Sequence, residues 1–258
     1  LPITLLSIFI MGRFVDKRKF SDFGLQLKER RWWADYGFGF LPGLLASTAY
    51  VFLLKFLGWA ELPLVRMRGA EFDSFTMALL LSLLTYAAVG VFEELMRAYQ
   101  IRNTIEGFSK TRLRLVGTTA IAVSLAGGWS LTAHIASGDP VFLIYIFITS
   151  MIYGLFFPWT KLVAPAMGVH FAWDFTLSSI FLLGTEGGQA TALFTVDLRG
   201  IPDMGMNLLP IVGIVPKTLI LILVSGWIRR NEGQITIYIK NWHHLPSLIV
   251  GLVLPNHR

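Results

Sequence analysis

The sequence predicts an all-α protein, a polytopic transmembrane helix bundle with about six to eight membrane helices. Three observations predict it. Hydrophobic residues make up 54% of the 258-residue chain, and charged residues make up 15%, against about 25% in ordinary globular domains. Apolar runs of spanning length also alternate with short polar loops. A soluble chain of this length needs more charge to cover its surface, so lipid is the natural solvent for the rest.

Six segments are long enough, or nearly so, to cross the bilayer, which takes about 20 helical residues for ~30 Å of hydrocarbon. They are Tyr36–Trp59, Phe75–Glu106, Leu115–Ile135, Val141–Trp159, Leu162–Leu183 and Met206–Ile228. The second is longer than a span and is expected to project into water. Leu1–Met11 is too short to span and is interpreted as the remainder of a truncated first helix. Without internal repeats, we expect one membrane domain over residues 1–258, with a cytoplasmic or interfacial tail at 231–258.

The net charge of +6 is concentrated in every second loop. Gly12–Arg31 contains seven basic residues and Gly107–Arg114 contains three, whereas Gly184–Met204 is slightly acidic. The positive-inside rule therefore places the basic loops in the cytoplasm, most simply in a cell inner membrane. The sequence has no basic stripe interleaved with aromatic residues, the pattern that would suggest a nucleic-acid partner. The sequence contains no cysteine, which excludes disulfides and thiolate chemistry.

Ionisable residues inside apolar segments are the main functional signal, because a charge at mid-bilayer costs ~2.5 kcal/mol or more. Seven occur: Glu93, Glu94, Arg97, His134, His170, Asp174 and Lys217. Lys217 follows Pro216 in the last segment and is interpreted as a snorkelling or cavity-facing lysine without a chemical role.

Two adjacent glutamates and an arginine lie in the run VFEELMRAYQ. Arg97 follows Glu93 by four residues and Glu94 by three, so both carboxylates can reach its guanidinium. The two glutamates point about 100° apart on a helix and need not share a task. A structural ion pair requires only one of them, which favours a function for the other.

Two histidines lie in GWSLTAHIAS and GVHFAWDF. Taken alone, His134 fits a hydrogen-bonded core residue or an interfacial one. His170 and Asp174 are four residues apart on one helix face. They can bridge helices, orient the imidazole, or point at one substrate or metal. Together the three segments supply groups that can activate water and stabilise an oxyanion.

These motifs, in this order on separate segments, resemble the CAAX protease and bacteriocin-processing family of intramembrane endopeptidases, which is related to the eukaryotic prenyl-protein protease. The family pattern is Glu-Glu-x-x-x-Arg, then Phe-x-x-x-His, then His-x-x-x-Asn or Asp. The resemblance covers roughly Phe75–Phe175 and is strongest in GLFFPWTKLVAPAMGVHFAWDF. In this chain EELMR is one residue short of the first motif, and Ser130 stands where phenylalanine is usual.

The resemblance implies a peptide or protein substrate with a membrane-associated, and in some members lipidated, segment. It implies that Glu93 and His134 activate water, and that His170 and Asp174 act on the oxyanion side. An ionised Asp174 cannot donate a hydrogen bond, so it would be protonated by burial or would orient His170. No cofactor is expected, although Glu93, His134 and His170 are suitable zinc ligands and the sequence leaves that alternative open.

The shortened first motif permits two alignments. Anchoring on the glutamates makes Glu93 the base and pairs Glu94 with Arg97. Anchoring on Arg97 pairs it with Glu93, puts Phe92 at the catalytic position and predicts an inactive protein. We favour the first.

Other classes fit less well. The chain lacks the H-E-x-x-H motif of zinc proteases, and a serine dyad of Ser130 with His170 leaves the glutamates unexplained. A non-enzymatic alternative is a degenerate family member that acts as a membrane scaffold, chaperone or carrier.

Overall fold

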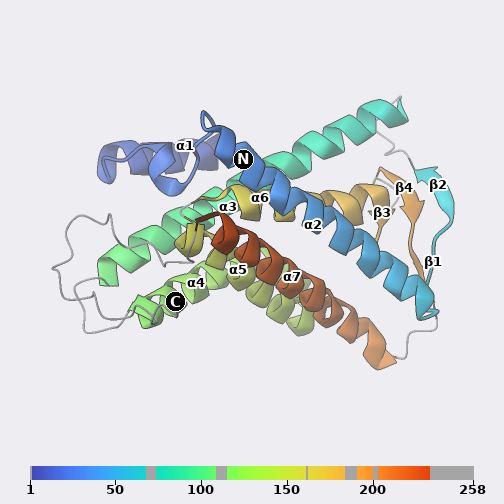
Figure 1. Ribbon diagram of the computed structural model, residues 1–258. Coiled ribbons are helices and arrows are strands. Elements are labelled where there is room, and N and C mark those ends of the chain that lie inside the picture. Colours follow the sequence, from blue (N-terminus) through green and yellow to red (C-terminus); the bar gives the residue numbers. More distant parts are fainter. Residues whose placement is uncertain are drawn as a thin grey trace.

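The computed structural model describes residues 2–67, 74–108, 115–160, 162–183, 191–199 and 203–232. These residues form a helix bundle with two small sheets at one end (Figure 1). The α-helices are α1 (Pro2–Ile10), α2 (Arg30–Phe56), α3 (Phe75–Phe108), α4 (Leu115–His134), α5 (Pro140–Thr160), α6 (Ala164–Phe175) and α7 (Asp203–Glu232). Short helical turns connect some of these helices. η1 (Met11–Val15) and η2 (Phe20–Phe23) follow α1, η3 (Ile135–Ser137) follows α4, and η4 (Thr176–Ile180) follows α6.

Four helices of the described part are long and apolar enough to cross a membrane: Arg30–Phe56, Phe75–Phe108, Leu115–Ser137 and Pro140–Thr160. The all-α class is therefore confirmed, and the protein is an integral membrane protein. The predicted segment Leu162–Leu183 is not among these four helices, and it contains α6 and the π-helical turn η4, of 12 and 5 residues. Pro165 lies in the first turn of α6, and the chain turns to extended backbone at Phe181. The α-helix between them has only 12 residues.

Helix α6 is the centre of the bundle, and its residues from Ala164 to Trp173 are all buried. Helix α2 crosses it at glycines. A Cβ atom on Gly168 would lie 2.7 Å from the backbone nitrogen of Phe40, and one on Gly43 would lie 3.0 Å from the Cβ of Ala172. Small residues thus bring the two backbones together, as is typical of helix packing in membranes. This packing fixes the position of α6.

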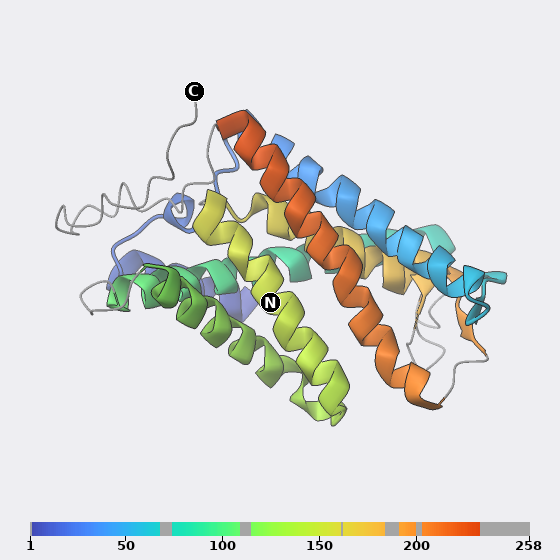
Figure 2. The same cartoon turned by 60° about the horizontal axis from the view of Figure 1, so that its bottom comes forward.

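The other helices surround this pair. Helices α4 and α5 lie side by side, and α7 packs along α5 and α2 (Figures 1 and 2). Helix α3 has 34 residues, about 51 Å of helix, and contacts α4, α5 and α6. The predicted projection of this helix beyond a single span agrees with its length.

Short strands form two small sheets, where the sequence predicted polar loops and, for Phe181–Leu182, the end of the apolar segment Leu162–Leu183. They are β1 (Ala60–Glu61), β2 (Leu64–Met67), β3 (Phe181–Leu182), β4 (Ala192–Thr195) and β5 (Asp197–Leu198). β1 pairs with β5, and β2, β4 and β3 are neighbours in that order. The pairing satisfies backbone groups of segments far apart in the sequence. A buried cluster that includes Tyr50, Trp173 and Phe181 links this end to α2 and α6.

The N-terminal segment docks against α3. Phe23 is buried, and the indole of Trp32 donates a hydrogen bond to the carbonyl oxygen of Gly24 at 2.9 Å. Arg18 donates to the Glu106 carboxylate at 2.7 Å, and this bond raises the pKa of the guanidinium. Leu1–Met11, expected to be a truncated helix, contains α1. The predicted tail at 231–258 lies almost wholly outside the described residues, as does part of the predicted outer loop Gly184–Met204.

Candidate active site

Helix α3 contributes two carboxylates and a guanidinium to a polar cluster inside the bundle. Glu94 and Arg97 form an ion pair, and each is only 2% exposed. Glu93 lies 3.7 Å from the same guanidinium, with 20% of its side chain exposed. Both sequence spacings therefore produce contacts, but Glu94 makes the close one. Glu93 is therefore partly exposed and within ion-pair distance of Arg97.

Helix α6 adds the imidazole of His170, which lies between carboxylates. Its Nδ1 is 2.7 Å from Oε1 of Glu94, and its Nε2 is 3.1 Å from Oδ2 of Asp174. Glu93 is 3.9 Å from the same Nε2 atom. The predicted contact between His170 and Asp174 is present. Glu94 also has the partner that the sequence did not reveal, because His170 comes from a different helix.

These contacts imply how His170 is protonated. An ionised carboxylate only accepts hydrogen bonds, whereas a neutral imidazole has one donor and one acceptor nitrogen. Both nitrogens of His170 face carboxylates at hydrogen-bonding distance. Both contacts are satisfied when the imidazole carries two protons, so His170 acts as a cation held between Glu94 and Asp174.

Glycines allow the helices to approach one another at this level. A Cβ atom on Gly90 would lie 3.5 Å from the carbonyl oxygen of Met167, so α3 runs directly against α6 one turn before Glu93. A Cβ on Gly154 of α5 would lie 3.4 Å from Cδ of Arg97. Because Gly154 has no side chain, the side chain of Arg97 can extend past it to the cluster.

Helices α4 and α5 complete the surroundings of the guanidinium. Arg97 donates to the hydroxyls of Ser130 at 3.3 Å and Ser150 at 3.5 Å. Its guanidinium also lies over the ring of Tyr153, 5.9 Å from the centroid. Ser130, which departs from the family pattern, thus has a polar partner. Sequence reasoning missed Ser150 and Tyr153, because a neutral polar residue in an apolar helix costs too little to stand out.

His134 is near the cluster but not part of it. Among its contacts in the described residues, Nδ1 lies 3.0 Å from the carbonyl oxygen of Ser130, and the ring packs edge-on against Phe142. The expected contact between His134 and Glu93 is absent from these. Because a carbonyl only accepts, Nδ1 carries the proton and Nε2 remains able to accept one.

The helix register nevertheless brings His134 to the level of Glu93. α3 and α4 are connected antiparallel neighbours, and Arg97 contacts Ser130 between them. Glu93 precedes Arg97 by four residues and His134 follows Ser130 by four, so both lie about 6 Å from this contact in the same direction. Glu93 also shares a helix face with Arg97, and His134 shares one with Ser130.

Lys217 of α7 is buried, at 5% exposure, so the snorkelling interpretation is wrong. Its ammonium donates to the Tyr145 hydroxyl at 2.7 Å and lies 4.6 Å from the centroids of the Tyr145 and Trp173 rings. The cavity-facing alternative agrees with this position at the edge of the cluster.

Three carboxylates and two cations lie at ion-pair distance in the cluster: Glu93, Glu94, Asp174, Arg97 and the protonated His170. Lys217 lies at the edge of this group, where it donates to the Tyr145 hydroxyl. Burying an unpaired charge in the bundle would cost several kcal/mol, and these pairings offset part of that cost. Glu93 and Asp174, with side chains 20% and 32% exposed, are the members accessible from outside.

Within the described residues, no group of three histidine, cysteine, aspartate or glutamate side chains is arranged to hold a metal ion. The zinc alternative with Glu93, His134 and His170 stays a prediction.

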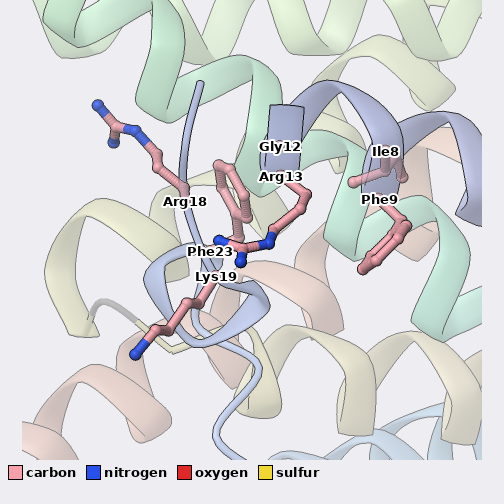
Figure 3. Close-up of a pocket in the computed structure, with 7 residues that line it drawn as sticks. All are labelled: Ile8, Phe9, Gly12, Arg13, Arg18, Lys19 and Phe23. Atoms are coloured by element: carbon pink, nitrogen blue, oxygen red, sulfur yellow. The ribbon is translucent and has the colours of Figure 1, made fainter. Parts of the chain in front are cut away.

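A pocket lies elsewhere, in the N-terminal segment (Figure 3). It is lined by Ile8, Phe9, Gly12, Arg13, Arg18, Lys19 and Phe23, none of which belongs to the polar cluster.

The bundle and its cluster define an integral membrane protein with a hydrogen-bonded, ion-paired polar site enclosed by helices. Residues 75–176, which hold all six predicted site residues, match the family model described as type II CAAX prenyl endopeptidase, Rce1-like. The match confirms the resemblance to CAAX proteases for the part of the chain from α3 to α6. Comparison with curated proteins and with solved structures gave no match.

Proposed function

We propose that the protein is an intramembrane endopeptidase of the CAAX-protease type, in which Glu93 activates water. The observation that carries the proposal is the difference between the surroundings of the two adjacent glutamates. Glu94 is enclosed between Arg97 and His170, whereas Glu93 is partly exposed and makes only long contacts with the same two groups. A general base needs this freedom to reach water and substrate.

The reaction follows from the atoms available. Glu93 takes a proton from water while the water oxygen bonds to the carbonyl carbon of the scissile peptide. The resulting tetrahedral oxyanion is stabilised by donors fixed in place beforehand. The proton passes to the leaving nitrogen, the C–N bond breaks, and a carboxylate and an amine leave. His134, at the level of Glu93 and with Nε2 able to accept a proton, is the second group for this transfer.

Asp174 has an orienting role in this scheme. It accepts a hydrogen bond from His170 at 3.1 Å and therefore holds the imidazole in place without donating to the oxyanion. Of the two possibilities raised by the sequence, protonated donor or orienting carboxylate, this contact supports the second. The substrate is a peptide or protein segment at the membrane, and the matched family makes a prenylated C-terminal segment the first choice.

The test is cleavage of two fluorogenic peptides by purified protein in detergent. One is a farnesylated peptide with a CAAX terminus and the other is an unmodified single-span membrane peptide. Wild type should cleave at least one of them, with or without a chelator. Glu93→Gln should not, whereas Glu61→Gln, a matched change at a side chain that is 61% exposed in β1, should behave as wild type.

The competing proposal is a degenerate scaffold, chaperone or carrier. It is favoured by the shortened EELMR motif and by the mutual neutralisation of the charges. Absence of cleavage of both peptides by folded wild type would decide for it.

A further inference from the structure

Tyr153 of α5 is a buried tyrosine whose hydroxyl has no hydrogen-bond partner among the described residues. The side chain is 4% exposed. Buried hydroxyls are normally paired, because leaving one unpaired costs about 1–3 kcal/mol. An unpaired hydroxyl beside a polar cluster therefore requires an explanation.

The ring of Tyr153 lies among the cations of the cluster. It is 5.2 Å from the ring of His170, and the guanidinium of Arg97 and the ammonium of Lys217 lie 5.9 Å and 5.2 Å from its centroid. An aromatic ring attracts cations that lie over its face. These contacts place the ring of Tyr153 at the polar cluster.

Most other polar groups of the cluster already have hydrogen-bond or ion-pair partners. Both nitrogens of His170 face carboxylates, and the two terminal nitrogens of Arg97 contact Glu94, Ser130 and Ser150. The ammonium of Lys217 donates to Tyr145. Among the described residues of the cluster, two buried donors lack a partner: the Tyr153 hydroxyl and Nε of Arg97. Only the hydroxyl can be removed without disturbing the ion pairs.

We infer that the Tyr153 hydroxyl is an oxyanion donor of the proposed peptidase. This inference rests on the proposed function. Asp174, as an ionised carboxylate, cannot donate to the tetrahedral oxyanion, so the site needs a neutral donor from another helix. Tyr153 donates a hydrogen bond to the substrate oxygen when negative charge develops there, and its proton stays on the phenol throughout. A donor that gains its partner only in the transition state lowers the barrier without strengthening substrate binding.

The decisive variant is Tyr153→Phe, which keeps the ring and its contacts and removes only the hydroxyl. We expect kcat to fall about 10²- to 10³-fold with KM nearly unchanged, as for the loss of one oxyanion donor. The melting temperature should stay equal or rise, because an unpaired buried hydroxyl is removed. Binding of a peptidyl phosphonate, whose anionic tetrahedral phosphorus resembles the intermediate, should weaken by a similar factor, while binding of an uncleavable ground-state peptide should not change.

Thr119→Val is the matched control. The Thr119 hydroxyl of α4 is also buried without a partner among the described residues, and it lies eleven residues, about 16 Å of helix, from Ser130. This variant should show the same effect on melting temperature with wild-type kcat.

Each other outcome overturns the inference in a recognisable way. Wild-type kcat in Tyr153→Phe would show that the hydroxyl is not a donor to the oxyanion, while the peptidase function stands. A marked fall in melting temperature would show that the hydroxyl has a structural partner. If folded wild type cleaves neither test peptide, the proposed function fails and the inference fails with it.

Discussion

Replacing Glu94 by glutamine should destabilise the protein strongly, because Glu94 holds two cations inside the bundle. Its carboxylate contacts both Arg97 and His170, and each of the three side chains is less than 10% exposed. The variant leaves the guanidinium with Glu93, 3.7 Å away, as its only carboxylate. Removing one partner of a fully buried pair costs ~3–5 kcal/mol. At ~2–4 °C per kcal/mol for a chain of this size, the melting temperature should fall by roughly 6–20 °C.

The assay is thermal unfolding of purified protein in detergent, with cleavage measured on the same samples. The double variant Glu94→Gln with Arg97→Gln removes the stranded cation and should recover part of the loss. Glu61→Gln, at the exposed end of β1, should melt within a few degrees of wild type. A Glu94→Gln protein that melts like wild type would refute the buried pairing. If that stable variant were inactive while Glu93→Gln remained active, the two glutamates would exchange roles.

Five further outcomes are expected. Glu93→Gln should reduce cleavage by a factor of about 10² to 10⁴, the usual contribution of a general base, with little change in melting temperature because the side chain is partly exposed. His134→Ala should lose activity and stay folded. His170→Ala should lose activity and also melt lower, because two carboxylates lose their imidazole; equal melting of the two histidine variants would contradict this placement. Chelation should leave cleavage unchanged, and a loss restored by stoichiometric Zn²⁺ would favour a metal site. A single cysteine at the exposed Lys19 should react with an impermeant reagent only after the cells are opened, and labelling of intact cells would reverse the predicted topology.

The spans from α3 to α5 could be predicted closely from the sequence. Phe75–Glu106 was expected and Phe75–Phe108 is observed, and Leu115–Ile135 compares with Leu115–His134. Long apolar runs bounded by charged or proline-containing loops determine such helices locally. The short α6 could not be delimited in this way, because its run of apolar residues continues past the end of the helix. The two small sheets could not be predicted either, because their strands have two to four residues and depend on partners far away in the sequence.

The contacts along a single helix were predictable, and those between helices were not. The spacings of Glu93, Glu94 and Arg97 determine that both carboxylates reach the guanidinium. Which glutamate meets His170 depends on how α3 is rotated against α6, and the sequence does not specify that rotation. The burial of Lys217 was missed for the same reason, because its aromatic partners belong to two other helices.

The electrostatics of the cluster link these observations to the proposed chemistry. Three carboxylates already lie at ion-pair distance from Arg97 and His170. Formation of the tetrahedral intermediate puts a further negative charge at the site, and lipid around the bundle cannot solvate it. The protein must therefore hold donors in reserve. The two unpaired buried donors of the cluster, the Tyr153 hydroxyl and Nε of Arg97, are the groups that meet this need.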